Sequence, residues 1–360
     1  MQRRPWALDR QVPGTAARSS YTGGMLRGVP FVGVTRGGRI ESVHAVAACA
    51  SDVHGNVLLA LGSIDEPVFL RSSAKPFITA AGVRAGTVER FGFTDRELAV
   101  MSASHNGEPF HIEAVQSILA KIGARVDDLR CGIHAPAYPP AAAALRQSGE
   151  APSALHNNCS GKHAGILALA RVLDAPLAGY PDPGHPAQRA ILALCERVSD
   201  DTFTPDRLGI DGCGIPVYAT SLRNAARSFA RLATLAELEP ADAAALARVR
   251  AAIIAEPDYV AGTKRFDTDL IRAANGRVVC KSGAEAVHAS ALLDGGVGLV
   301  LKVVDGAHRA AAPAAIALLR QLEALDHNEL QMLGAHARPA VHNHAGMLVG
   351  GIAALDFVAG

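Results

Sequence analysis

Arg71-Ser72-Ser73-Ala74-Lys75-Pro76 joins a short strand-like segment, Val68-Phe69-Leu70, to the first helical stretch of this 360-residue chain. A serine hydroxyl is a poor nucleophile unless a neighbouring base accepts its proton. Ser72 and Lys75 are three residues apart at the expected start of a helix, so they share one face and lie within reach of each other. The lysine acts as a base near pH 7 only where burial or nearby cations lower its pKa from about 10.4. On spacing alone, the pattern also fits a serine that caps a helix beside a solvated lysine.

A second short motif, Lys281-Ser282-Gly283, follows the strand-like residues Arg277-Val278-Val279-Cys280. One motif between a strand and a helix, and another on a later strand, are typical of serine acyl-transferases of the β-lactamase and penicillin-binding type. Even once the first motif is granted, a simple turn explains the second motif equally well. Together the two motifs predict a strand, a helical insert and a returning strand around one site.

Strand-like and helical patterns follow one another in four blocks. Short apolar runs mark strands between 31 and 70, including a hairpin around Asp52-Val53-His54-Gly55-Asn56. Helical spacing dominates from 77 to 274, strand patterns return from 277 to 304, and a helix is predicted over 308–325. This order predicts an α/β (α+β) fold with a largely antiparallel sheet built from both chain ends, flanking helices and an inserted helical domain.

The blocks divide the chain into expected domains. Residues 29–85 and 271–360 form a sheet domain, residues 86–270 form a mainly helical domain, and the active site lies between them. Residues 1–28 are basic, contain several prolines and glycines, and lack the apolar stretch of a secretory signal. We expect a flexible N-terminal extension there.

The bulk composition argues for a small-molecule ligand. The chain carries 35 basic and 34 acidic residues, a net charge of +1, which gives no electrostatic footprint for nucleic acid or an anionic membrane. No apolar run reaches the roughly 20 residues that a membrane span needs. Six widely spaced cysteines without an export signal argue against a disulfide framework and predict a cytoplasmic protein.

Two further polar clusters interrupt the helical block. Ser102-Ala103-Ser104-His105-Asn106-Gly107-Glu108 supplies hydroxyl, imidazole and amide groups for an amino-acid substrate, although it also fits a helix-initiating loop. His156-Asn157-Asn158-Cys159-Ser160-Gly161-Lys162-His163 and, fifty residues later, Asp211-Gly212-Cys213-Gly214 each present a cysteine in polar surroundings. Two such cysteines with another donor could bind a metal such as zinc, or be two unrelated buried thiols.

Four short stretches of the sequence resemble motifs of a known family and occur in the same order as in that family. They are the six residues at 71–76, the stretch Ser102–Pro109, the stretch His156–Gly165 and the stretch Asp211–Pro216. They are similar to the asparaginase II family, the inducible rhizobial-type L-asparaginases, over about residues 31–356. The resemblance implies a fold like that of serine β-lactamases and glutaminases.

The resemblance also implies roles for individual residues. Two catalytic pairs would act in tandem, Ser72 with Lys75 and Ser104 with Lys281. A zinc site beside the pocket would use Cys159, Lys162 and Cys213, and the chain would form a homodimer. The residues expected to contact the substrate are Arg71, His105, Asn106, Gly107, His163 and Asp211.

The sequence therefore predicts an L-asparaginase. Ser72 attacks the side-chain amide carbon of L-asparagine, neutral Lys75 accepts its proton, ammonia leaves, and water hydrolyses the acyl-enzyme to L-aspartate. Ser104 and Lys281 would relay protons, and which serine is the nucleophile stays open. Alternatives are a glutaminase or other serine amidase of the same fold, and a non-catalytic protein that binds zinc or a ligand.

Overall fold

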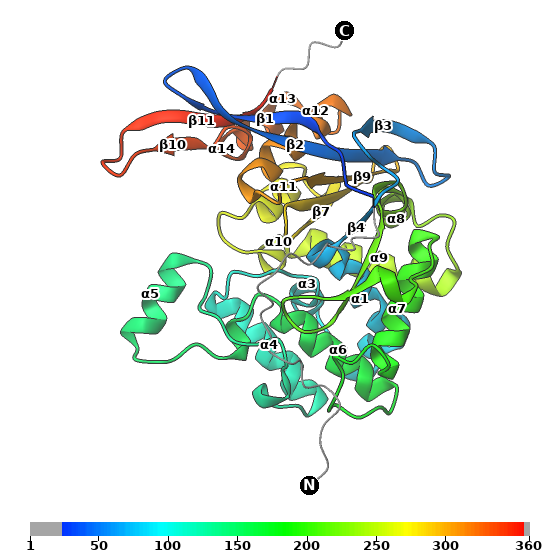
Figure 1. The fold of residues 1–360 in the computed structure, drawn as a ribbon. Helices are drawn as coiled ribbons and strands as arrows, with labels where there is room; N and C mark the ends of the chain where they lie inside the picture. The colour runs from blue at the N-terminus through cyan, green and yellow to red at the C-terminus, as the bar shows by residue number, and fades with distance from the viewer. Residues whose placement is uncertain (1–23, 356–360) are drawn as a thin grey trace, which may run out of the picture.

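The computed structural model describes residues 24–355 and contains one large antiparallel sheet with helices packed around and below it (Figure 1). Most of the predicted extension, residues 1–28, lies outside the described residues. The sheet has eight strands, all joined by antiparallel pairing, with β3 attached to β2 beside the main path. In spatial order they are β10 (Ala340–His342), β11 (Leu348–Ala354), β1 (Val29–Arg36), β2 (Arg39–Ser51), β9 (Val297–Val303), β8 (Val287–Leu292) and β7 (Val278–Gly283), with β3 (Val57–Leu61) on β2.

The sheet is assembled from the two distant parts of the chain that the sequence predicted. β1 pairs with β11, and β2 pairs with β9 from Val46 opposite Val303 to Ser51 opposite Gly298. The prediction of an α/β (α+β) fold with a largely antiparallel sheet and an inserted helical region is confirmed. The exact domain boundaries stay a prediction, because α8 from the insert packs directly on the sheet.

Most of the helices come between the two groups of strands in the sequence, and they lie below the large sheet in Figure 1. A small sheet of β4 (Pro67–Phe69), β6 (Pro216–Ser221) and β5 (Leu208–Ile210) lies beside them. The helices of the insert are α1 (Lys75–Arg84), α2 (Thr87–Phe91), α3 (Asp95–Met101), α4 (Pro109–Ile122), α5 (Pro139–Gln147), α6 (Ser160–Val172), α7 (Pro186–Ser199), α8 (Leu222–Thr234), α9 (Pro240–Ala255), α10 (Pro257–Val260) and α11 (Phe266–Ala273). After the last central strand come α12 (Ala311–Gln321), α13 (His327–Met332) and α14 (Gly334–Ala337).

Local sequence explains where several elements begin and turn. The β2–β3 hairpin closes as predicted, because Asp52 Oδ1 accepts hydrogen bonds from the backbone of His54 and Asn56 while Gly55 adopts φ 85°. Thr94 and Glu97 form a capping box at the start of α3. Ser221 caps α8 by accepting from the backbone of Asn224.

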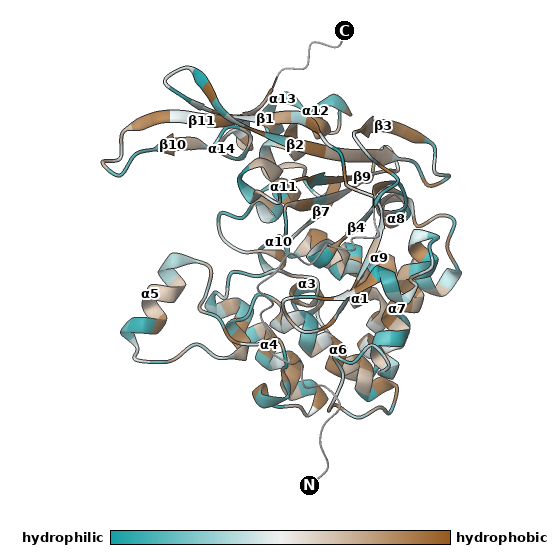
Figure 2. Ribbon diagram, viewed as in Figure 1, coloured by the Kyte–Doolittle hydropathy of each residue, from teal (hydrophilic) through white to brown (hydrophobic). Residues whose placement is uncertain are grey.

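The buried core begins where α8 and α12 pack against the central strands and continues through the helices of the insert. Every residue of β8 is buried, so this strand has both faces covered. Figure 2 shows apolar residues along much of β2, β3 and β9. Among the described residues, no helix is long and apolar enough to span a bilayer.

Five strands were not predicted, including β6, Pro216–Ser221, which begins at a proline inside the block predicted to be helical. β8, Val287–Leu292, contains His288 and Ser290, whose polar side chains are hydrogen-bonded to each other inside the sheet. β11 contains Gly350 and Gly351, which weaken the strand pattern. β5 and β10 have only three residues each, too few to show an alternation. The helix predicted over 308–325 is a 3-10 turn followed by α12.

Candidate active site

A pocket of about 460 Å³ opens where the sheet meets the helical insert. Ser72 enters it from the 3-10 turn before α1, Ser104 from the loop after α3, and Ser282 from the end of β7. The remaining lining residues come from the loop before α6, from α11 and its approach, and from the end of β7 to the start of α12: Asn158, Arg265, Phe266, Asp267, Gly283, Ala284, Val287, His308, Ala311 and Ala312. The two sequence motifs therefore meet at one site.

Close packing holds the two motifs together. A side chain at Gly283 would place its Cβ only 2.7 Å from the carbonyl oxygen of Leu70 and 3.2 Å from the backbone nitrogen of Ser73. Only glycine allows β7 to approach the 3-10 turn this closely. Ser73 itself is buried and donates its hydroxyl to Leu70 O at 2.6 Å, so it has a structural role. Ser72 is the serine of this turn that faces the pocket.

Lys75 lies fully buried beside the second serine. Its Nζ donates to Ser104 Oγ at 3.0 Å and to Asn158 O at 3.4 Å, and it also contacts Ala103 O. Burial lowers the pKa of Lys75 to about 8, and the ammonium groups of Lys162 and Lys281 act in the same direction. A lysine in this state loses its proton near neutrality and can accept one from a hydroxyl.

Lys281 has different neighbours from those that the resemblance implied. Its Nζ lies 3.3 Å from Asp267 Oδ2 and donates to Ser282 O at 2.7 Å. The lysine that contacts Ser104 is instead Lys75. The implied Ser104–Lys281 pair is thus replaced by a Ser104–Lys75 contact and a Lys281–Asp267 ion pair. Asp267 was not singled out from the sequence.

The loop after Ser104 supports the pocket from behind. His105 is buried, and its ring donates to Ser160 Oγ at 2.9 Å and accepts from Gly107 N at 3.1 Å. Asn106 accepts from Arg265 Nη1 at 2.9 Å. Gly107 has φ 73°, which favours glycine. The described contacts give His105, Asn106 and Gly107 this scaffolding role, and none of the three lines the pocket.

Arg71, Asp211 and His163 also lie outside the pocket lining. Arg71 has a left-handed backbone, φ 53°, and its guanidinium binds Asp211 Oδ1 at 2.6 and 3.0 Å. This ion pair ties the turn that carries Ser72 to the loop that carries Cys213. His163 is buried against the hydroxyl of Tyr180, with Nδ1 and the oxygen 2.5 Å apart. These residues shape the surroundings of the site.

The three residues expected to bind zinc lie together. Lys162 Nζ is 2.9 Å from Cys213 Sγ, and the Cys213 thiol donates a hydrogen bond to Cys159. That hydrogen bond, against the effect of burial, holds the pKa of the Cys159 thiol well below its usual range. Two sulfurs and an amine at one point are donors that suit a borderline ion, although lysine is a rare ligand. Within residues 24–355, no cluster of three or more His, Cys, Asp and Glu side chains adds a further candidate.

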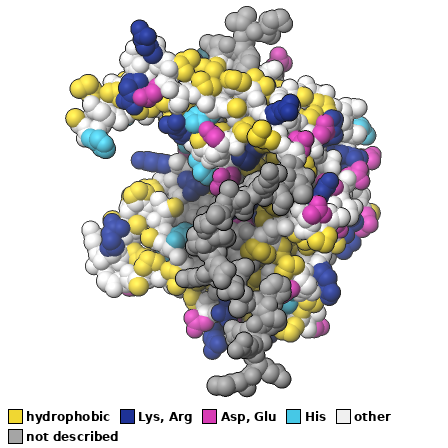
Figure 3. Space-filling model, viewed as in Figure 1, with side chains coloured by type: hydrophobic (Ala, Val, Ile, Leu, Met, Phe, Trp, Pro, Cys, Tyr) yellow, Lys and Arg dark blue, Asp and Glu magenta, His cyan; other side chains and the backbone are white. Residues whose placement is uncertain are grey.

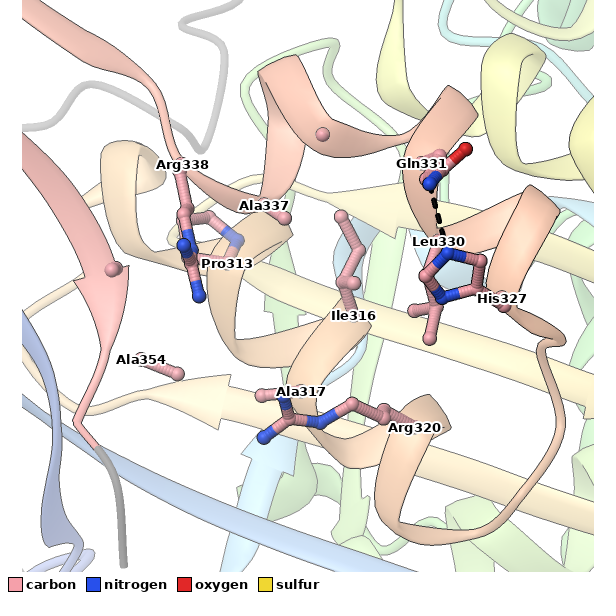
Figure 4. Close-up of a pocket in the computed structure, with 12 residues that line it drawn as sticks. Pro313, Ile316, Ala317, Arg320, His327, Leu330, Gln331, Ala337, Arg338 and Ala354 are labelled. Carbon is pink, nitrogen blue, oxygen red and sulfur yellow. Dashed lines mark hydrogen bonds between the residues drawn. The ribbon is translucent and has the colours of Figure 1, made fainter.

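Another groove, of about 410 Å³, lies between α12, α13, α14 and β11 (Figure 4). Its floor is apolar, with Ile316 and Leu330 among the lining residues, and His327 and Gln331 are hydrogen-bonded at its rim. It contains neither a serine nor a lysine. The chemistry described above therefore belongs to the pocket that contains Ser72 and Ser104.

The fold and the site define a mixed α/β protein with a helical insert, in which a buried lysine contacts a pocket serine. The chain belongs to the L-asparaginase II family, whose pattern it matches over residues 32–354. The resemblance noted from the sequence is confirmed, and the family consists of asparaginase-type amidohydrolases.

Comparison with individual proteins gives only distant similarity. No curated protein sequence matches the chain. A crystal structure of Mglu in its native form in 4.3 M NaCl is 15% identical, with a TM-score of 0.43; the match covers 79% of this chain and 63% of that one. A putative beta-lactamase from Bacteroides dorei DSM 17855 is 10% identical, with a TM-score of 0.38; the match covers 77% of this chain and 94% of that one.

Proposed function

We propose that the protein is an L-asparaginase that hydrolyses L-asparagine to L-aspartate and ammonia through an acyl-enzyme. The contact between Lys75 Nζ and Ser104 Oγ, 3.0 Å apart in a pocket that Ser72 also lines, is the observation that carries this proposal. A buried lysine beside hydroxyls supplies a base without a histidine.

In the proposed reaction, Ser72 Oγ attacks the side-chain amide carbon and its proton passes to Lys75 Nζ. The carbon–nitrogen bond then breaks, and Lys75 returns the proton through the Ser104 hydroxyl to the departing ammonia. Water attacks the resulting ester, which releases L-aspartate and restores the Ser72 hydroxyl. The guanidinium of Arg265, in the pocket wall, is the group best suited to the substrate's α-carboxylate.

Trapping the acyl-enzyme tests the assignment of the two serines. Protein quenched in acid during turnover should carry the aspartyl group on the peptide that contains Ser72, and Ser72→Ala should abolish this adduct. Ser73→Ala is the matched control, because Ser73 is buried away from the pocket. An adduct on Ser104 would exchange the roles of the two serines, and no adduct on either would refute the mechanism.

Ammonia release from L-asparagine and L-glutamine, measured side by side, tests the substrate. Release from L-asparagine at a clearly higher kcat/KM is the expected result. Preference for L-glutamine would make the protein a glutaminase, since one methylene separates the two substrates. Absence of release from either would favour the non-catalytic alternative.

We further propose that Cys159, Cys213 and Lys162 hold one Zn²⁺ ion. The converging sulfurs and amine support this assignment, and both cysteines would bind as thiolates. The ion would order the wall behind Lys75, while the serines and Lys75 perform the chemistry. Elemental analysis of protein purified without chelator should find about one zinc per chain, and its absence would refute the site.

We also propose a homodimer. α5 has no buried residue, and it projects on the same side of the molecule as the β10–β11 hairpin (Figure 1). Met347 and Leu348 on that hairpin are more than 60% exposed, and Figure 3 shows a hollow between the two projections. A second copy that packs on this side would cover these surfaces. Light scattering should give about twice the monomer mass of 37.3 kDa, and a single monomeric species would refute the dimer.

The cytoplasmic location expected from the sequence stays a prediction.

A further inference from the structure

Asp267 and Lys281 form an ion pair that is almost completely enclosed. Their side chains are 2% and 1% exposed, and Lys281 Nζ lies 3.3 Å from Asp267 Oδ2. Placing two charges in such surroundings is costly, and removing one partner leaves an uncompensated buried charge. The buried arrangement is therefore stable only while Asp267 is ionised and Lys281 is protonated.

The carboxylate of Asp267 is held ionised by further donors. It accepts from Ser282 Oγ at 2.5 Å and from Ser282 N at 2.9 Å, and His288 Nδ1 lies 3.9 Å away. Lys281 and these hydrogen bonds overcome the effect of burial and hold the pKa of Asp267 well below its usual range. An ionised carboxylate in this position keeps the proton on the lysine beside it.

The groups around Lys281 act on its charge in both directions: burial and Arg265 lower the pKa of Lys281 from its usual value, and the ion pair with Asp267, 3.3 Å away, opposes this shift. α11 supplies Asp267, the approach to α11 supplies Arg265, and β8 supplies His288, whose pKa is lowered to about 4 so that it stays neutral. Within β7, Lys281 donates to Ser282 O. Asp267 is thus the one anion among these groups, and the described contacts show no hydroxyl that accepts from Lys281.

We propose that Lys281, buried directly behind the pocket wall that Asp267 and Ser282 form, acts as a permanent cation and not as a second base, and that Asp267 is the positioning residue that fixes its charge. This inference rests on the proposed amidohydrolase function. The charge favours the transition-state oxyanion that forms when a hydroxyl attacks an amide. It also favours the neutral form of Lys75, which the ammonium of Lys281 affects across the pocket.

Arginine substitutions separate a cation from a base, because a guanidinium stays protonated in proteins. Lys281→Arg should keep activity within about tenfold of the wild type, while Lys281→Gln should lose about a hundredfold or more. Lys75→Arg should be as inactive as Lys75→Gln, because the base is gone in both. If Lys281→Arg folds and is as impaired as Lys281→Gln, the permanent-cation role is refuted.

Asp267→Asn should change kcat in opposite directions for the two possible roles of Lys281, a permanent cation or a base. For a permanent cation, Asp267→Asn should reduce kcat at pH 7 towards the level of Lys281→Gln, because a buried lysine without its counterion loses its proton. The double variant should then lose little more. For a base, releasing Lys281 from Asp267 would maintain or raise activity, which would overturn the proposal. Asp269→Asn is the matched control on α11, since Asp269 is one-third exposed and pairs with His336.

Unfolding measurements test the ion pair independently of catalysis. Asp267→Asn and Lys281→Gln should each lower Tm by roughly 5 °C or more, and the double variant by less than the sum. Additive losses would show that the two charges do not act as a pair. If the wild type releases no ammonia from L-asparagine or L-glutamine while the Tm changes are still non-additive, that result would refute the proposed function but leave the ion pair established.

Discussion

Lys75 and Lys162 are two buried lysines on neighbouring helices, yet their surroundings favour opposite protonation states. Lys75 opens α1 and faces backbone carbonyls and the Ser104 hydroxyl. Lys162 lies in the first turn of α6 and faces the sulfurs of Cys159 and Cys213. Burial lowers the pKa of both side chains, but the two cysteines outweigh it at Lys162 and raise its pKa. Burial alone does not determine which lysine can be a base.

The largest expected difference between these lysines is in turnover. Lys75→Met should reduce kcat for L-asparagine by about three orders of magnitude or more, because it removes the base from the chemical step. The combined Ser72→Ala and Lys75→Met variant should be hardly worse than either alone. Steady-state kinetics with circular dichroism as a folding control measure this. Lys162→Met should keep kcat within about tenfold, and an equal loss at both positions would remove the distinction.

The pH dependence of the rate is the next largest effect. Because the neutral form of Lys75 is the active one, kcat/KM should rise about tenfold per pH unit at low pH and level off above a midpoint near 8. A bound zinc ion behind Lys75 would displace the protons of Cys213 and Lys162, so the net charge of the cluster stays the same and the midpoint should stay near 8. Profiles of the zinc-loaded and chelated protein test both statements. A rate that falls between pH 6 and 8 would show that a protonated group is essential instead.

Zinc removal should have a smaller effect, since Lys162 and its sulfurs lie outside the pocket lining. The chelated protein should keep measurable kcat with KM raised several-fold, and Cys213→Ser should behave like the chelated protein. Occupancy should fall as pH drops, because thiolate ligands become protonated. Complete loss of kcat on chelation, restored by zinc, would make the metal catalytic and erase the difference between the two lysines.

The smallest effect concerns Ser73, the buried serine next to Ser72, whose hydroxyl donates to Leu70 O. Ser73→Ala should leave kcat and KM within about twofold of the wild type and cost about 1 kcal/mol of unfolding free energy, the usual value of one buried hydrogen bond. Thermal unfolding and kinetics of the same preparation measure the two quantities. A large loss of activity would show that Ser73 contributes to the nucleophile pair.

Local motifs predicted the parts of the site that depend on neighbouring residues in the chain. The 71–76 stretch and Lys281-Ser282-Gly283 marked two walls of the pocket, and Asp52 and Asn56 marked the hairpin. The Lys75–Ser104 contact could not be predicted, because it depends on how the loop after α3 is held by backbone bonds to Val260 and Ala261. Asp267 carried no local signal, since its importance comes from the packing of α11 against β7.

The interleaved order of the sheet has a consequence for how the protein is made. β1 and β2 emerge from the ribosome long before their partners β11 and β9, which follow some three hundred and two hundred and fifty residues later in the chain. Until then the early strands have unpaired backbone edges. Ser72 and Ser104 are also made before β7, the strand that carries Lys281. Such long-range pairing slows folding and prolongs the exposure of aggregation-prone surface. We therefore expect chaperones to bind the nascent chain. The active site should form only after the last strands have paired with the sheet.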